Sequence, residues 1–181
     1  MLDYDTKHEW KLIIHDDLIF EDDAFKKIQY ILRFAPKFMM SFYSCRNKIY
    51  RDAWEKRHHI LASYMQYWPP CMAYHKSMQK DLIEYFDKKA DIGLISEDVV
   101  VWKYCSDNDK LVYALTHGLV QHDLEQKSVV GNSPSIGKNR RDSEHYNPDF
   151  NPNIVDWKKE FENPSIFKKK YTDNKGIKDE A

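Results

Sequence analysis

Five carboxylates lie within eight residues near the start of the sequence: Asp16, Asp17, Glu21, Asp22 and Asp23. Several oxygen ligands in one place could bind a hard divalent cation. The calcium-loop pattern with its fixed glycine is absent, however, and charged clusters are usually solvated or paired. Asp22 and Asp23 directly precede a predicted helix, where they could cap its first turn and favour its dipole. We therefore expect helix capping and salt bridges rather than a metal site.

The cysteine and histidine residues could support nucleophilic or metal chemistry. Cys71 and His75 are four residues apart, but no third orienting group or oxyanion motif accompanies them. His58 and His59 are adjacent and cannot present both rings to one metal from a single helix face. The cysteines have neither disulfide-framework nor zinc-site spacing: Cys45, Cys71 and Cys105. We expect buried thiols and a hydrogen-bonded or interface histidine.

Arg51 and His58 have an Arg-x6-His spacing that resembles HEPN-type ribonucleases, in which an arginine and a histidine on a helical bundle cleave RNA. The match extends to Asp52 and covers no further residues. A helix rich in arginine and histidine also produces this spacing by chance. A small HEPN-like ribonuclease that uses Arg51 and His58 is therefore the alternative function.

Helices are the elements expected to position these residues. Residues 11–23 are predicted to form a bent, half-buried connector, followed by a helical stripe over 25–32 that Pro36 ends. A second stripe over 38–60 predicts a helix of about twenty residues with one basic face. A third helix is expected over 74–89. The predicted fold is all-α, with a small bundle of about three to four helices in a domain at residues 1–90.

Residues 91–181 differ in composition from the predicted helical domain at 1–90. Residues 91–130 form an added segment of uncertain structure, in which 99–102 favours a strand and 111–120 fits either a helix or a strand. Residues 131–181 are rich in Asn, Pro, Ser and charge, which predicts an extended, partner-bound tail. Isolated anchors interrupt its polarity: Trp157, Phe161, Ile166 and Phe167.

Bulk composition disfavours some functions. The chain has 181 residues, with 28 Lys and Arg against 29 Asp and Glu, so no basic excess favours nucleic acid as a partner. The 14% aromatic content suits protein interfaces as well as cores. No apolar run approaches the roughly 20 residues of a transmembrane helix, and the first ten residues are unlike a signal or transit peptide.

Several short motifs follow one another in a familiar order. KLIIHDDLIFE at 11–21 keeps the order of a segment that reads Lys-Leu-Gly-Leu, two residues, Asp-Asp, then apolar and acidic residues. Ile13 replaces the glycine, and one residue rather than two precedes the acidic pair. LRFAP at 32–36 corresponds to Arg-Arg-Leu-Pro. Arg46 and Arg51 then precede HHIL at 58–61, as spaced arginines precede His-His-Leu-Leu, and a tryptophan follows. In this order, residues 8–90 resemble subunit 7 of the mitochondrial cytochrome bc1 complex, the ubiquinone-binding-protein type.

This resemblance implies a non-catalytic accessory subunit of respiratory complex III (ubiquinol–cytochrome c reductase), without a cofactor or metal of its own. The subunit would be all-helical and peripheral, on the matrix side of the mitochondrial inner membrane. It would pack on cytochrome b and core subunits and support assembly and stability. The C-terminal extension could reach neighbouring respiratory complexes. A scaffold subunit of another large assembly is a further alternative. Charge pairs and a histidine would form the interface: Asp16, Asp17, Glu21, Arg46, Arg51 and His58.

Overall fold

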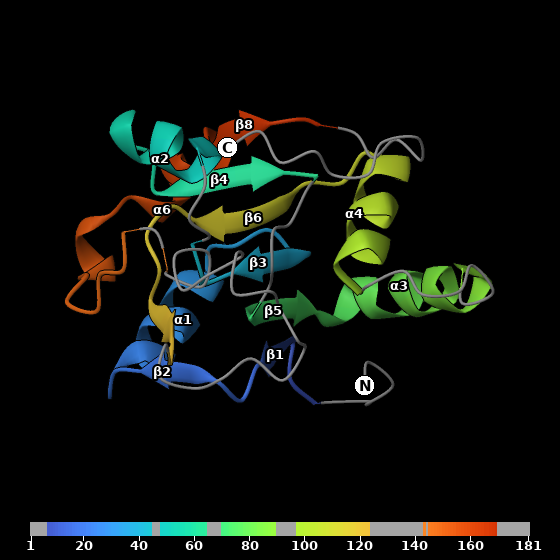
Figure 1. Cartoon of the computed structure of the whole chain (residues 1–181), viewed down its shortest axis with the longest axis horizontal. Helices are drawn as coiled ribbons and strands as arrows, with labels where there is room; N and C mark the ends of the chain where they lie inside the picture. Colours follow the sequence, from blue (N-terminus) through green and yellow to red (C-terminus); the bar gives the residue numbers. More distant parts are fainter. Residues whose placement is uncertain are drawn as a thin grey trace, which may run out of the picture.

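The computed structural model shows a mixed α/β fold, so the all-α prediction is wrong (Figure 1). It describes residues 7–44, 48–64, 70–89, 97–123, 143 and 145–169. The described strands are β1 (Trp10–Ile14), β2 (Leu18–Phe20), β3 (Met39–Ser41), β4 (Ile60–Ser63), β5 (Cys71–His75), β6 (Val112–Leu115), β7 (Val120–His122) and β8 (Ser165–Phe167). The described helices are α1 (Ala24–Leu32), α2 (Lys48–Glu55), α3 (Lys76–Lys89), α4 (Glu97–Asp107) and α6 (Trp157–Glu162), with the 3₁₀ turn η2 (Pro152–Ile154).

Six strands form one mixed sheet in the order β1-β5-β3-β6-β4-β8. Neighbours are antiparallel except for the parallel pairs β3–β6 and β4–β8. The remaining strands, β2 and β7, pair with each other. Figure 1 shows α3 and α4 together at one end of the sheet, with α1, α2 and α6 toward the other end. Residues 11–23, predicted as a bent connector, hold β1, a turn and β2. We keep the name connector for this stretch, whose strand β2 pairs with β7 outside the main sheet.

A hydrophobic core lies on each face of the main sheet. In β5, Cys71 and Ala73 belong to one cluster, whereas Met72 and Tyr74 belong to the other. Successive side chains of a strand point to opposite faces, so the two clusters are the two sides of the sheet. Every residue of β5 is buried, which is the pattern of a strand covered on both faces.

The predicted second helix, 38–60, is replaced by β3, α2 and β4. Its stripe has helical spacing, but burial is not confined to the stripe. All residues of 39–43 and 60–64 are buried, and all but Ser41 and Ser63 are apolar. A one-sided helix would leave some of them in water, whereas an internal strand buries consecutive residues. The third predicted helix begins two residues late, at Lys76, because 71–75 is β5.

Two other segments differ from expectation. Residues 99–102 form part of α4 rather than a strand, because burial of Val101, Trp102 and Cys105 against α3 and the sheet outweighs β-propensity. Residues 145–169 pack on the same core as the N-terminal elements: Trp157 is 1% exposed, and β8 extends the main sheet beside β4. The rest of the predicted tail, apart from Ser143, lies outside the described residues, as do residues 124–130. None of the described helices is both long and apolar enough to cross a membrane.

Candidate functional site

The predicted acidic interface residues lie in the connector, and two of them contact their own chain. Asp16 is exposed in the turn that joins β1 to β2. The Asp17 carboxylate lies 3.3 Å from Nδ1 of His122 on β7, and the Glu21 carboxylate accepts a hydrogen bond of 3.2 Å from the Tyr146 hydroxyl. These contacts fasten the connector to segments more than a hundred residues away in sequence.

Capping of α1 differs from expectation. Asp23 occupies the N-cap position, but its side chain makes no capping hydrogen bond and instead pairs with Lys27 one turn later, at 2.9 Å. Within the described ranges, no group of three or more His, Cys, Asp or Glu side chains is placed to hold a metal ion.

Arg51 and His58 do not share a helix. Helix α2 ends at Glu55, and Arg57 has a left-handed backbone with φ of 61°, so the chain turns away before His58. The His58 carbonyl accepts a hydrogen bond from Thr116 Oγ1 at 2.7 Å, which fixes this loop against the end of β6. Arg51 is exposed, and Arg46 lies outside the described residues. The helical Arg-x6-His arrangement is therefore absent from this pair.

The described cysteines are buried thiols, as the sequence predicted. Cys71 and Cys105 are each 0% exposed, and burial raises the pKa of each thiol to about 12. Neither forms a thiolate near neutral pH, and the thiolate is the nucleophilic form. Cys71 also lies on a strand rather than on a helix with His75. A Cys–His nucleophile is excluded at this position, and Cys45 lies outside the described residues.

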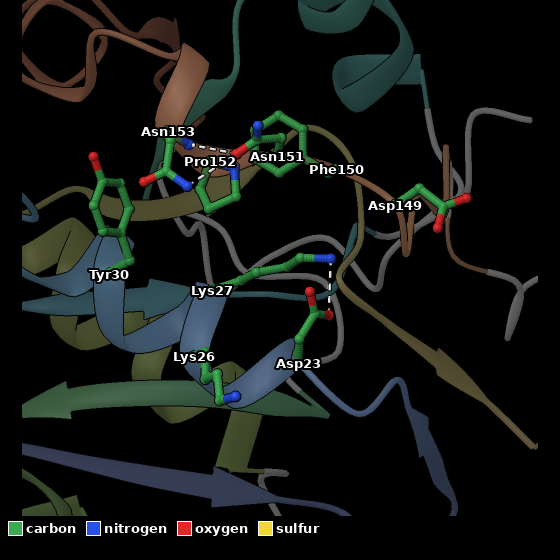
Figure 2. A pocket seen from close by; sticks show the side chains of 9 residues that line it. All are labelled: Asp23, Lys26, Lys27, Tyr30, Asp149, Phe150, Asn151, Pro152 and Asn153. Atoms are coloured by element: carbon green, nitrogen blue, oxygen red, sulfur yellow. Dashed lines mark hydrogen bonds and ion pairs between the residues drawn. The ribbon is translucent and has the colours of Figure 1, made fainter.

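A hollow of about 440 Å³ opens between α1 and the segment 149–153 (Figure 2). Figure 2 shows Lys27 paired with Asp23 one turn earlier on α1, and the Lys27 ammonium also donates to the Pro148 carbonyl oxygen. Two lysines and two aspartates line the hollow, so its formal charge is balanced. This balance gives little preference for a charged ligand.

A cluster of three imidazoles lies behind that hollow. We use the name histidine cluster for His59, His117 and His145. The ring centres of His59 and His117 are 5.6 Å apart, and the Phe150 ring, which lines the hollow, is centred 4.0 Å from that of His117. The cluster joins four parts of the chain: the start of β4, the loop after β6, the segment 145–150 and, through an aromatic contact of His59 with Trp157, helix α6.

Burial keeps the centre of the cluster uncharged. His117 is 0% exposed, and burial, followed by the nearby imidazoles of His59 and His145, lowers its pKa to about 3. Burial also lowers the pKa of His59, against the opposing effect of the Glu160 carboxylate. Neither ring nitrogen of His117 has a hydrogen-bond partner among the described residues. A buried, neutral imidazole without solvent access is poorly suited to proton transfer, but it makes folding sensitive to acid.

Sequence reasoning missed His117 and His145. They lie 58 and 86 residues after His59 in the sequence, and no spacing rule relates the three positions. Only the fold brings them together. The apolar residues of the connector divide: Leu12, Leu18 and Phe20 pack on the core, whereas Ile14 and Ile19 are exposed.

The exposed apolar side chains are concentrated at the connector. Of the six large ones exposed among the described residues, three fall within twelve residues of sequence: Ile14 at 38%, Ile19 at 46% and Phe25 at 46%. Carboxylates alternate with them. We call the exposed residues Ile14, Asp16, Ile19, Asp22 and Phe25 the connector surface.

Comparison of the chain with models of known protein families found no match, and comparison with curated proteins found none either.

Proposed function

We propose that this chain is a non-catalytic, protein-binding subunit of a larger assembly and that the connector surface contacts its partner. The single observation that carries the proposal is the exposure of Ile14, Ile19 and Phe25 within one short stretch. Covering apolar surface yields about 25 cal/mol per Å², and grouped exposed apolar residues mark interaction sites. Phe25 is held in place for such a contact, because its ring stacks on Phe20 at 5.0 Å.

The charges of the connector surface favour a basic partner. Asp16 and Asp22 are exposed and have no ion-pair partner among the described residues. Lysine or arginine residues that surround an apolar contact on the partner would complement them. Such complementarity fixes the register of an interface and speeds association more than it raises affinity.

Respiratory complex III is the specific assembly that the motif order suggests. The motifs that suggest it lie here in β1, β2, the end of α1, α2 and the loop that leads from α2 into β4, not in successive helices. The proposal of cytochrome b and core subunits as partners, on the matrix side of the mitochondrial inner membrane, therefore rests on sequence resemblance alone. The HEPN-like alternative gains no support from the separate placement of Arg51 and His58.

Affinity purification of the tagged full-length chain from its native cells tests the proposal. We expect the wild-type chain to recover a defined set of proteins and the double variant Ile19→Ser, Phe25→Ser to lose them. A matched control is Ile154→Ser, which changes an equally apolar side chain that is 79% exposed on η2. Recovery of cytochrome b would identify complex III. Undiminished recovery by the double variant would exclude the connector surface as the interface.

Charge reversal gives an independent measurement. The double variant Asp16→Lys, Asp22→Lys should slow association with the recovered partner and reduce its salt dependence, because both effects come from electrostatic steering. The control Glu162→Lys reverses an exposed charge on α6 instead. Equal association rates for the two variants would contradict a basic partner at the connector.

A further inference from the structure

A second hollow, of about 430 Å³, lies where β1, the end of α1 and the last residue of β5 meet. Trp10 and Leu32 supply apolar surface, and Arg33 and Lys37 supply positive charge. The hollow shares no lining residue with the one in Figure 2. Its size lies within the range of small-molecule sites, about 300 to 1,000 Å³, and it combines apolar surface with a few polar groups, as such sites do.

His75 lines this hollow with a polar atom that no described residue satisfies. The side chain is 3% exposed, and its Nε2 has no hydrogen-bond partner among the described residues. Its Nδ1, in contrast, accepts a hydrogen bond of 3.2 Å from the backbone N–H of Ser77 in the first turn of α3. His75 thereby caps that helix, and its ring orientation is fixed from one side.

The Ser77 contact assigns the position of the imidazole proton. A backbone N–H can only donate, so Nδ1 accepts and the single proton of the neutral ring lies on Nε2. The Ser77 hydroxyl is 2.7 Å from the same Nδ1 and 3.1 Å from the Lys37 carbonyl oxygen, and it can donate to either. Burial lowers the pKa of His75, so the ring is neutral near pH 7. His75 therefore lines the hollow as a neutral imidazole, and its buried Nε2–H has no hydrogen-bond partner among the described residues.

Cationic side chains surround this donor. Lys37 lies 4.0 Å from the Glu9 carboxylate, but both side chains are more than half exposed, and such pairs contribute little. The Arg33 guanidinium lies 5.8 Å from the ring centre of Tyr30 and has no carboxylate partner among the described residues. Arg33 and Lys37 line the hollow together with one carboxylate, that of Glu9, so cations outnumber anions there, and this excess suits an anion.

We propose that this hollow binds a small organic anion. Arg33, Lys37 and the Nε2–H of His75 hold its phosphate or carboxylate group, and a flat apolar part lies against Trp10. Trp10 already packs edge-on against the His75 ring, with ring centres 4.9 Å apart. The site is separate from the connector surface and goes beyond the protein-binding function, so either can fail without the other.

Calorimetric titration of the full-length chain tests the site, with adenosine monophosphate as the probe and adenosine and inorganic phosphate as its two halves. We expect the monophosphate to bind more tightly than either half. Lys37→Gln and Arg33→Gln should each weaken its binding about tenfold, the size of one charge-assisted hydrogen bond. The control Lys80→Gln, which changes a lysine on the exposed side of α3, should bind as the wild type does.

Three results would overturn the proposal: no binding of the monophosphate to the wild-type chain, equal weakening in Lys80→Gln, or binding that neither Arg33→Gln nor Lys37→Gln weakens. Equal affinity for inorganic phosphate would overturn the role of Trp10. Because replacing His75 could unfold α3, its part is tested by imidazole ¹H–¹⁵N spectra of the wild-type chain. We expect a His75 Nε2–H tautomer whose signal shifts when the monophosphate is added. An Nδ1–H tautomer, or an unchanged signal, would refute the assignment.

Discussion

Acid should destabilise this fold through His117, and the variant His117→Phe should remove that part of the acid sensitivity. The pKa of His117 is about 3 in the folded chain, compared with 6.5 for an ordinary histidine. The unfolded chain therefore binds more protons between these two values. The contribution of neutral His117 to the free energy of unfolding is fully present above pH 6.5 and decreases as the pH falls below 6.5.

The magnitude follows from the width of this window. One pKa unit corresponds to 1.36 kcal/mol, so acidification from pH 6.5 to 5.0 should cost about 2 kcal/mol through His117 alone. A phenyl ring is flat like imidazole, although larger, and would meet the aromatic surfaces of Trp54 and Phe150, whose ring centres lie 5.6 and 4.0 Å from that of His117. It also removes two buried nitrogens without partners, so the variant should be at least as stable as the wild type at pH 7.5.

Urea unfolding followed by tryptophan fluorescence between pH 7.5 and 5.0 measures this difference. Other histidines also titrate, so the relevant quantity is the difference in unfolding free energy between His117→Phe and the wild type at each pH. This difference should grow by about 2 kcal/mol in favour of the variant as the pH falls to 5. The matched control His15→Phe replaces an exposed histidine in the β1–β2 turn and should keep the wild-type slope. Parallel slopes for His117→Phe and the wild type would refute the reasoning.

Three further predictions concern the C-terminal half of the fold, and each is measured by urea unfolding. Trp157→Ala should cost about 3 to 5 kcal/mol, because this 1%-exposed side chain packs between α6 and the sheet; a loss below about 1 kcal/mol would show that residues 145–169 do not belong to the core. Gly118→Ala should cost about 1 to 3 kcal/mol, because the added Cβ would lie 1.9 Å from Ser143 Oγ, and wild-type stability would contradict that close approach. Asp156→Ala should cost about 1 kcal/mol, because the Asp156 carboxylate caps α6 by accepting a hydrogen bond of 3.1 Å from the Lys159 backbone N–H, whereas Asp156→Asn should retain most of this stabilisation. Equal losses of stability in the two variants would argue against the cap.

The elements that could be read from sequence are those whose signal is local. Helix α1 begins within one residue of its predicted start and ends at the predicted residue, because its apolar stripe and the following proline act within one short segment. The burial of Cys71 and Cys105 also follows from residue type and the lack of any pairing pattern. The bend of the connector at Asp16 and Asp17 follows from an acidic pair between two apolar runs.

The strands could not be read in this way. The apolar residues of 38–60 fit a helical period, but β3 exists because β5 and β6 lie on either side of it, and these strands are 30 or more residues away. The reverse error occurred in α4, where three consecutive valines suggested a strand but packing against α3 decided for a helix. Hydrophobic periodicity and secondary-structure propensity predict an element poorly when the segment that packs against it or pairs with it is distant in sequence.

The sequence by itself determined which residues must leave water and where the chain must turn, because hydrophobicity, proline geometry and charge are properties of single residues and near neighbours. The tertiary structure alone decided the fold class, the neutrality of His117 and the unpaired N–H of His75. His117 is neutral because segments around residues 54, 59 and 150 enclose it, and His75 faces a hollow because β1 and α1 leave one there. Desolvation and hydrogen-bond partners depend on which groups surround a side chain, and those groups are assembled only by folding.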